Sequence, residues 1–582
     1  MKKIAALFCI FSILFSFFPD VILQAQLSRP AAIYGPDEVS PQENMYLHID
    51  RDKYIAGEEV WFSIYNLDPE TGKLSAGSII AYAELLNPWN VPVIQKRFQL
   101  SGGRSEGNFT LPDSISSGTY TVRAYTNRMK NFLPDNCFMQ NIDIFNSFRG
   151  SEFWRKEDPV RSVRDSSFFP ENNEDMIALK TDTLFSRREK VTLDLAVTNY
   201  DSELSGISEM SISVAPAGIS GMHTPIGINK TADIKAPLKY VTESEGHYLS
   251  GSIRYREGNI SDSSDFLFMS VQGKVAEFRY SEIDSAGRFR FLLPADNKFR
   301  NLILQPEHPN NNMILEIEPS FPRFFPDSYC FKTALPDSLL DLFSGLSFNY
   351  QTEKIYGINL KKNAEPDDSK ITLKKRRFYG IPEMEIFLDD YIKLPSMEEV
   401  FIEFLPGVIL RSRRSGYEIK ITNPLTDNFY VEPPVVMIDG VIINDLTVLV
   451  DLDPERVEKI EAIKTPYLIG DLILHGIVNV ITRSGDFSEV TIPEYAVILP
   501  YKIIDDPSLI VFPDYSSEKL RQSRTPDLRN TLYWNPSVKT NSNGKAEVEF
   551  WTSDLPGVYT ITIQGITGTG KKISLYKSFT VR

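Results

Sequence analysis

The feature that most constrains the fold of this chain is a pair of apolar runs, 435–438 and 441–443, separated only by Asp439-Gly440. Both residues of this pair tolerate a positive φ angle, so the expected structure is two strands joined by a tight turn. A hairpin of this kind buries its apolar side chains only against further elements. The neighbouring segments must therefore supply the rest of a small folded unit.

Those segments carry helix and strand signals. Ser396 followed by Glu399 is the pattern of a capping box, which predicts a helix starting there. Asp453 before Pro454 predicts a second capped helix, because aspartate accepts backbone N–H groups and proline fits the first helical turn. The apolar run 477–481 then predicts a final strand. We expect an α+β unit over residues 381–486.

This order of elements resembles the plug domain of TonB-dependent outer-membrane receptors. The residues that carry the resemblance are Asp439, Gly440, Glu461, Gly470, Gly476 and Asn479. The resemblance implies that they have structural or interaction roles, and that the unit relays a pull from TonB inside a barrel. Residues 487–582 show no barrel pattern, so we expect a unit without its own barrel.

Composition sets the broad class. A chain of 582 residues is too long for one core, and roughly three to five domains are expected. Aromatic residues at 12% and 37 prolines favour strands and turns over long helices. The net charge of −15 argues against binding to nucleic acid and to anionic lipid, since both need a basic face.

The N-terminus predicts export. Lys2 and Lys3 precede the apolar run 4–18, and Ala25 is a small residue at the expected cleavage site. The run is shorter than the ~20 residues that span a bilayer. We expect a signal peptide over residues 1–25, a mature chain without a membrane span, and a location in the periplasm or at the outer membrane.

Period-two alternation dominates the remainder of the chain and predicts a mainly β fold. Val60, Phe62 and Ile64 alternate with their neighbours in the first of several such segments. The predicted units are a β-sandwich over 42–148, a linker over 149–175, a second β region over 176–240, a third β-sandwich over 241–324, a helical and charged connector over 325–380, and a connector with a C-terminal β-sandwich over 487–582. For the last unit we expect either that strands near 495–504 complete it or that the α+β unit is inserted within it.

Residues 47–58 and 118–126 resemble the start and end of an alpha-2-macroglobulin sandwich, and a generic sandwich corner is the alternative. Residues 180–191 repeat the sequence pattern of residues 47–58. The resemblance implies serial macroglobulin- or immunoglobulin-like antiparallel sandwiches. Thioester-bearing members contain a Gly-Cys-Gly-Glu-Gln segment, which the surroundings of Cys137 and Cys330 do not match. These two cysteines are expected either to pair or to be buried thiols.

Catalytic and metal motifs are weak. The five histidines include no metal-ligand spacing, so each is expected to be structural or on the surface. Residues 103–107 match G-x-S-x-G but lie between predicted strands, where a nucleophile elbow does not fit. Residues 565–571 resemble a phosphate loop but fit a hairpin turn better. We expect no catalytic residues, no metal and no cofactor.

Three functions remain open. The main prediction is a non-enzymatic cell-envelope protein, a binding or accessory component of TonB-dependent uptake whose partner is an envelope protein such as a barrel receptor. The first alternative is a macroglobulin-like protein that interacts with proteases without a thioester, with 149–175 and 486–530 as candidate bait segments. The second alternative is a secreted hydrolase with an unrecognised site.

Overall fold

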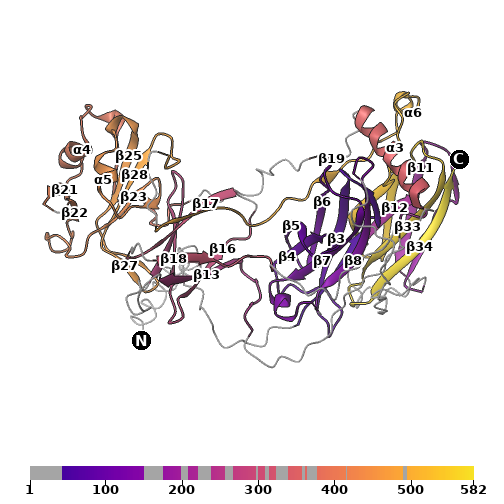
Figure 1. Cartoon of the computed structure of the whole chain (residues 1–582), viewed down its shortest axis with the longest axis horizontal. Helices are drawn as coiled ribbons and strands as arrows, with labels where there is room; N and C mark the ends of the chain where they lie inside the picture. The colour runs from indigo at the N-terminus through magenta and orange to yellow at the C-terminus, as the bar shows by residue number, and fades with distance from the viewer. Residues whose placement is uncertain are drawn as a thin grey trace, which may run out of the picture.

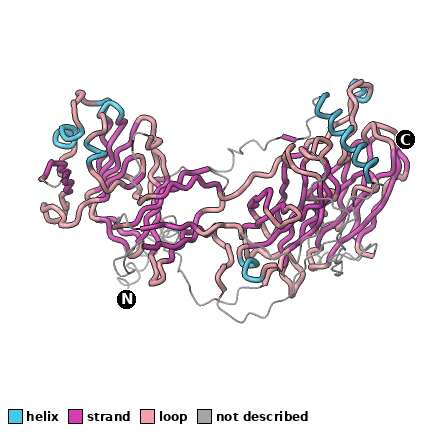
Figure 2. The backbone as a smooth tube through the Cα atoms, viewed as in Figure 1, coloured by secondary structure: helices cyan, strands magenta, loops and turns pink. Residues whose placement is uncertain are grey.

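The computed structural model describes most of the chain. The described residues are 42–134, 136–149, 175–197, 208–220, 238–255, 266–296, 299–308, 313–322, 339–356, 361–362, 376–414, 416–488, 490 and 495–582. The predicted signal peptide, most of the predicted linker, and Cys330 lie outside these residues. Figure 1 shows two lobes, and Figure 2 shows that strands dominate both.

The first sandwich is antiparallel apart from one short parallel pairing, of β2 with β8. Its sheets have the orders β1-β3-β6 and β2-β8-β7-β4-β5. Its elements are β1 (Asn44–Ile49), β2 (Lys53–Ile55), β3 (Glu59–Leu67), β4 (Ile80–Leu86), β5 (Pro92–Gln99), β6 (Arg104–Thr110), β7 (Gly118–Thr126), the 3-10 helix η1 (Arg128–Phe132) and β8 (Phe138–Phe145). Ser105 of the G-x-S-x-G match lies inside β6, whereas the sequence pattern places it between two strands.

The second sandwich is built from two distant parts of the chain. The first part holds β9 (Ile177–Lys180), β10 (Leu184–Phe185), β11 (Lys190–Val197) and β12 (Glu209–Pro216). The second part holds β31 (Tyr533–Lys539), β32 (Lys545–Trp551), β33 (Gly557–Ile566) and β34 (Lys572–Val581). β12 pairs with β31 and β33, and β11 pairs with β32. The sequence places these parts in separate units, whereas strand pairing joins them in one.

The third sandwich is also completed from a distance. Its sheets have the orders β16-β13-β18 and β15-β14-β17-β29. The strands are β13 (His247–Tyr255), β14 (Phe266–Val271), β15 (Glu277–Glu282), β16 (Arg288–Leu293), β17 (Phe299–Pro306), β18 (Met313–Ile317) and β29 (Val497–Lys502). The expectation that a strand near 495–504 completes the C-terminal unit is therefore wrong, because β29 pairs with β17.

The α+β unit lies between β18 and β29 in the chain. Its main sheet has the order β20-β25-β28-β23-β24, and two hairpins, β21–β22 and β26–β27, flank it. Its elements are β20 (Met384–Phe387), η5 (Leu388–Asp390), α4 (Met397–Phe404), β21 (Val408–Arg413), β22 (Gly416–Ile421), β23 (Val435–Ile438), β24 (Val441–Ile442), α5 (Thr447–Val450), η6 (Pro454–Arg456), β25 (Val457–Ile463), β26 (Tyr467–Ile469), β27 (Leu472–Leu474) and β28 (Ile477–Thr482).

The local signals of this unit are largely confirmed. Ser396 caps α4 by accepting the Glu399 N–H at 3.3 Å. Asp439 and Gly440 have φ angles of +48° and +77°, as a tight turn between β23 and β24 requires. The prediction of a helix after Asp453 is wrong. Only the single 3-10 turn η6 forms there, because β25 begins at Val457, directly after it.

Four further elements lie outside the sandwiches and the α+β unit. They are α3 (Leu340–Tyr356), β19 (Lys361–Lys362), β30 (Leu509–Ile510) and α6 (Glu518–Arg521). The helical part of the predicted connector 325–380 forms as α3, and Phe343 and Leu346 bury against Ile55 and Ile219. Figure 1 shows α3 lying on the lobe of the first and second sandwiches, although it follows β18 of the other lobe.

The architecture is therefore nested. The α+β unit is inserted into the third sandwich, and that assembly with α3 is inserted into the second sandwich. One hydrophobic core runs from the first sandwich into the third and includes Tyr82, Leu249 and Leu304. Among the described residues, no helix combines the length and apolarity that a bilayer crossing requires.

Candidate functional site

The Asp439-Gly440 turn is buried and carries a fully engaged carboxylate. Asp439 accepts the Thr482 N–H at 2.7 Å, the Thr482 hydroxyl at 2.6 Å and the Phe487 N–H at 3.0 Å. These bonds tie the turn to the end of β28 and to the segment that follows it. A buried carboxylate needs donors of this kind, because an unpaired charge is costly in the interior.

A chain of buried hydrogen bonds starts from the same turn. Asn479 on β28 accepts the Gly440 N–H at 3.2 Å and donates to the Tyr379 hydroxyl at 2.9 Å. Tyr379 in turn donates to Glu461 on β25 at 2.6 Å. Burial raises the pKa of the Tyr379 hydroxyl, so it stays protonated as a donor. The chain crosses the central strands of the sheet and fixes their register.

Four of the six residues predicted from the sequence are thus brought together: Asp439, Gly440, Asn479 and Glu461. The other two glycines shape neighbouring backbone. A Cβ on Gly476 would lie 2.6 Å from Ile421, so a close approach of side chain to backbone requires glycine there. Gly470 forms the turn of the β26–β27 hairpin with a φ angle of +56°.

Sequence reasoning missed two members of this cluster, Tyr379 and Arg377. Both fall in the segment predicted as a charged connector, yet Arg377 contacts Glu461 at 2.6 Å and Lys459 approaches the same carboxylate at 2.7 Å. The aromatic pair Phe378-Tyr379 after the basic run is the signal that marks the start of a packed unit.

The α+β unit is docked firmly on the third sandwich. The Gly273 N–H donates to the Asp439 carbonyl at 3.0 Å, and Gln305 donates to the Ile442 carbonyl at 2.9 Å. A shared apolar cluster contains Phe278 of β15 and Met437 of β23. The predicted turn is therefore an internal joint and is not available to a partner.

Ten large apolar side chains among the described residues of the α+β unit are exposed. The exposed large hydrophobic side chains of this unit are Ile381, Phe387, Tyr391, Ile392, Ile402, Leu425, Phe429, Val431, Leu468 and Ile473. Four of them lie in one stretch along β20 and η5, which we call the 381–392 edge. Ile381 and Ile392 are 91% and 77% exposed. Among the described strands, β20 pairs only with β25, so it is a sheet edge. Exposed apolar surface beside a strand edge is typical of a protein contact.

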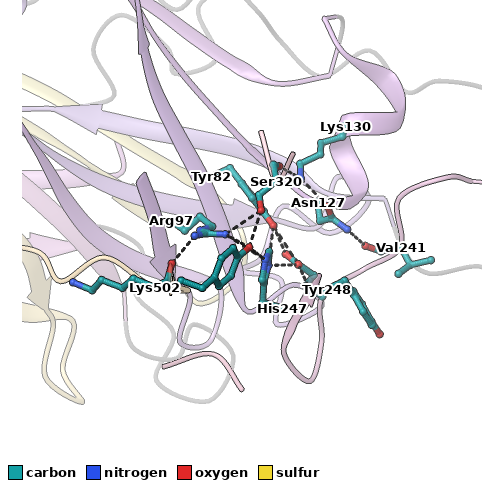
Figure 3. A network of polar contacts seen from close by, with 11 residues as sticks. Tyr82, Arg97, Asn127, Lys130, Val241, His247, Tyr248, Ser320 and Lys502 are labelled. Carbon is teal, nitrogen blue, oxygen red and sulfur yellow. Dashed lines mark hydrogen bonds and ion pairs between the residues drawn. The ribbon is translucent and has the colours of Figure 1, made fainter. Parts of the chain in front are cut away.

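A second polar cluster, which the sequence does not single out, joins the first and third sandwiches (Figure 3). His247 contacts Glu243 at 2.8 Å through Nδ1 and the Tyr501 hydroxyl at 2.6 Å through Nε2. Tyr82 of β4 donates to Glu243 at 3.0 Å, and Arg97 of β5 donates to Tyr501 at 2.8 Å.

This cluster has the composition of a proton relay but the connections of a structural tie. Ser320 contacts the Tyr501 hydroxyl at 2.8 Å, so the tyrosine stands between the serine and His247. Burial lowers the pKa of His247, which keeps its imidazole neutral. Both ring nitrogens of His247 have partners within the protein, in agreement with the structural role expected for the histidines.

The structure places one of the two cysteines and the loop that resembles a phosphate-binding loop. Cys137 is buried, and its Sγ lies 3.4 Å from the Pro134 carbonyl, whereas Cys330 lies outside the described residues. Among the described residues, no group of three or more histidine, cysteine, aspartate or glutamate side chains is placed to hold a metal ion. Residues 567–571 form the turn between β33 and β34, so the prediction of a hairpin turn there is confirmed.

No protein-family model matches the sequence, and no curated protein matches it. The chain is similar in structure to the Escherichia coli alpha-2-macroglobulin activated by porcine elastase, with 10% identity and a TM-score of 0.24 over 93% of this chain and 44% of that one. It is also similar to the Salmonella alpha-2-macroglobulin reacted with methylamine, with 11% identity and a TM-score of 0.24 over 95% of this chain and 40% of that one. The chain thus spans less than half the length of these macroglobulins. At these values the likeness sets no function, and the function is argued from the chain's own contacts.

Proposed function

We propose that this chain is a non-enzymatic protein of the cell envelope whose β-sandwiches carry the α+β unit and present it to a protein partner. The observation that carries the proposal is the concentration of exposed apolar side chains on that unit, above all at the 381–392 edge. Large apolar side chains that are exposed together along one stretch of a surface are typical of a protein contact.

The way in which the α+β unit is attached to the third sandwich supports this role. The joint between the α+β unit and the third sandwich is rigid, because Asp439, Gln305 and Phe378 all take part in hydrogen bonds across it. The unit is therefore held in one orientation with the 381–392 edge outward. A preordered surface loses less entropy on binding than a mobile one.

The finer proposal names the partner. The order of turn, strands and glycines resembles the plug of TonB-dependent receptors, so we infer that the partner is an outer-membrane barrel receptor of an uptake system. β20 offers backbone groups for strand addition, and the apolar side chains beside it offer the buried centre of an interface. The predicted signal peptide is consistent with such a location.

The test is site-specific photo-crosslinking in cells of the source organism. A photoreactive residue at Ile392 is expected to capture a barrel receptor, identified by mass spectrometry. The control position is Val558 on β33, which is also exposed, at 48%, but lies on the second sandwich. Equal capture from both positions, or capture of no envelope protein from Ile392, refutes the proposal.

A paired substitution separates binding from folding. Ile392→Asp is expected to abolish co-purification of the receptor while leaving the unfolding midpoint unchanged, because the side chain is exposed. Val558→Asp serves as the matched control and is expected to leave co-purification intact. Retained binding in Ile392→Asp would show that this edge is not the interface.

A second candidate function is interaction with proteases. One observation favours it: Arg521 and Arg524 are exposed in the segment 511–530, whose regular structure is limited to α6. Incubation with trypsin followed by size-exclusion chromatography tests it. Cleavage after Arg521 or Arg524 with the protease retained in the complex would support this function, whereas free, active protease after cleavage would eliminate it.

A further inference from the structure

The helix α3 docks with one face on the joint between the first and second sandwiches, as Figure 1 shows. Phe343 and Leu346 of this face pack with Ile55 of β2 in one apolar cluster. Asn530, just before β31, donates to the Leu346 carbonyl at 3.1 Å and to Glu58 at 2.8 Å. The Glu58 carboxylate therefore lies next to the docked face of the helix.

The docked face also contains a carboxyl group. Glu353 follows Leu346 by seven residues and the buried Asn349 by four, so all three lie on one side of the helix. The Oε1 atom of Glu353 is buried and, among the described residues, has no hydrogen-bond partner. The next residue, Lys354, is exposed and pairs with Asp113 at 3.1 Å. An ionised carboxylate at the position of Glu353 is costly, because water is excluded and no donor replaces it.

The surroundings of Glu353 already contain more negative than positive groups. The charged side chains of this cluster are Asp50, Arg51 and Glu58 of the first sandwich and Asp527 and Arg529 of the segment before β31. Arg51 pairs with Glu58 at 3.0 Å, and Arg529 pairs with Asp527 at 3.0 Å. Both guanidinium groups are thus matched before Glu353 is counted. Its ionisation would add a fourth carboxylate against two cations, so the docked helix favours the protonated form.

We propose that α3 is a proton-controlled cover of the apolar surface at this joint, docked while Glu353 is protonated and loosened as that carboxyl ionises. Release of the helix would expose Ile55, Ala215 and Ile219, which now pack with α3. Apolar surface that becomes accessible in this way is suited to a protein contact. The device lies on the other lobe from the 381–392 edge and does not depend on the partner proposed there.

The direction of the pH effect follows from the two states of the carboxyl. Burial, together with repulsion by Glu58 and Asp527, raises the pKa of Glu353 from 4.5 to about 8 when α3 is docked. In the released helix the carboxyl is in water and keeps its ordinary pKa, so docking takes up a proton between these two values. Docking is therefore strongest below pH 4.5. It weakens by about tenfold per pH unit as the pH rises toward 8, and is constant above that.

The main experiment is hydrogen exchange with mass spectrometry on the full chain and on Glu353→Gln, at pH 5.5, 6.5 and 7.5. The amides of α3 exchange when it leaves the sandwiches, because an isolated helix of 17 residues is marginal in water. Comparing the same amides at the same pH removes the chemical pH dependence of exchange. The opening constant of the unsubstituted chain, divided by that of the variant, should rise about 50- to 100-fold between pH 5.5 and 7.5.

Two controls locate the effect. Asp341→Asn removes an exposed carboxylate from the same helix and should keep the pH profile of the unsubstituted chain. The amides of β4, in the core of the first sandwich, should stay protected throughout. The same pH profile in Glu353→Gln as in the unsubstituted chain would overturn the proposal. An equal pH-dependent loss of protection in β4 would overturn it as well, in favour of general unfolding of the sandwich.

Discussion

The first and second sandwiches have the same arrangement of strands at one sheet edge but stabilise the turn beside it in different ways. In each, a short strand pairs in parallel with the last strand: β2 with β8, and β10 with β34. In each, a tyrosine donates to the carbonyl four residues earlier, Tyr120 to Ser116 and Tyr559 to Leu555, both at 2.8 Å. Such tyrosine corners are a feature of β-sandwiches. The segments 47–58 and 180–191, which repeat each other in sequence, contain these two short strands.

The difference lies at the turn after the short strand. Gly57 has a φ angle of +90°, and a Cβ there would lie 2.3 Å from both Asp113 and Tyr350 of α3. The equivalent turn of the second sandwich has Arg188 at a φ angle of +54°. At Gly57 the hydroxyl of Tyr350 occupies the space that a side chain would need, so glycine is required. At the equivalent position the side chain of Arg188 itself reaches the end of α6.

Arg188 uses its side chain to fasten the segment 520–525. Its guanidinium donates to the carbonyls of Leu520, Ser523 and Thr525 at 3.0, 2.7 and 2.7 Å, and it pairs with Asp554. The same turn can thus be stabilised by packing against a neighbouring helix, as at Gly57, or by hydrogen bonds from its own side chain, as at Arg188. Four predictions test the comparison of the two sandwiches, in decreasing order of expected effect.

The largest effect is expected from Arg188→Ala. It would leave several carbonyls and Asp554 without their donor, at a cost of about 3–5 kcal/mol in the free energy of unfolding. Guanidinium denaturation followed by tryptophan fluorescence measures it, since Trp534 and Trp551 lie in this sandwich. Arg187→Ala, at the exposed neighbouring position, is the control and should change stability little. Equal stability of both variants would show that the fastening is not needed.

The next effect tests the covered turn. Gly57→Ala combines an unfavourable positive φ with contact against Tyr350 and should cost about 2–3 kcal/mol. Gly218→Ala provides the control, because Gly218 has a φ angle of +94° but nothing within 4 Å of an added Cβ. The difference between the two variants in denaturation measures the combined cost of the contacts with Asp113 and with Tyr350 of α3. A zero difference would contradict the role given to α3.

The contact between the two sandwiches should be sensitive to acid through His48. This imidazole is buried, contacts Ser211 at 2.6 Å and packs on Trp534, and burial lowers its pKa to about 3. The unfolded chain binds the proton from about pH 6.5 downward. The stability is therefore present above pH 6.5 and is lost as the pH falls toward 3, by about 2 kcal/mol between pH 6.5 and 5.

Unfolding experiments at pH 7, 6 and 5 on the unsubstituted chain and on His48→Asn check this expectation. The asparagine variant is expected to be less stable at every pH but to lose less stability between pH 6.5 and 5. The half-exposed His475 lies in the other lobe, so His475→Asn should keep the original pH dependence. An unchanged slope in His48→Asn would assign the acid sensitivity to other groups.

The smallest effects are expected at the two tyrosine corners. Tyr120→Phe and Tyr559→Phe each remove one buried hydrogen bond and should each cost about 1 kcal/mol. If the corners are equivalent, the two costs agree within a few tenths of a kcal/mol in parallel denaturation series. A several-fold larger cost at one position would show that the shared geometry hides different energetic roles.

Local features of this fold could be predicted from the sequence, whereas distant pairings could not. The turn at Asp439-Gly440, the cap at Ser396 and the helix α3 depend on neighbouring residues, and all three form. The pairing of β12 with β33 joins residues separated by more than half the chain. Alternation specifies which face of a strand is buried, but many other strands can satisfy that face.

The polar chain of the α+β unit shows the same limit. Asn479, Glu461 and Gly440 could be singled out because they interrupt apolar strands or occupy a turn. Tyr379, which links Asn479 to Glu461, lies outside the predicted unit, since the charged run before it is typical of a connector. The 381–392 edge was equally hidden, because exposure of an apolar residue depends on the packing of distant elements.

The nesting also imposes an order on biosynthesis. The first sandwich has all its strands early, the α+β unit is complete next, the third sandwich must wait for β29, and the second must wait for β31–β34. The chain therefore matures from the inside outward. β12 lacks both of its strand neighbours, and β11 lacks β32, until the last part of the chain is made, so we expect β12 to be the strand most exposed to wrong pairing.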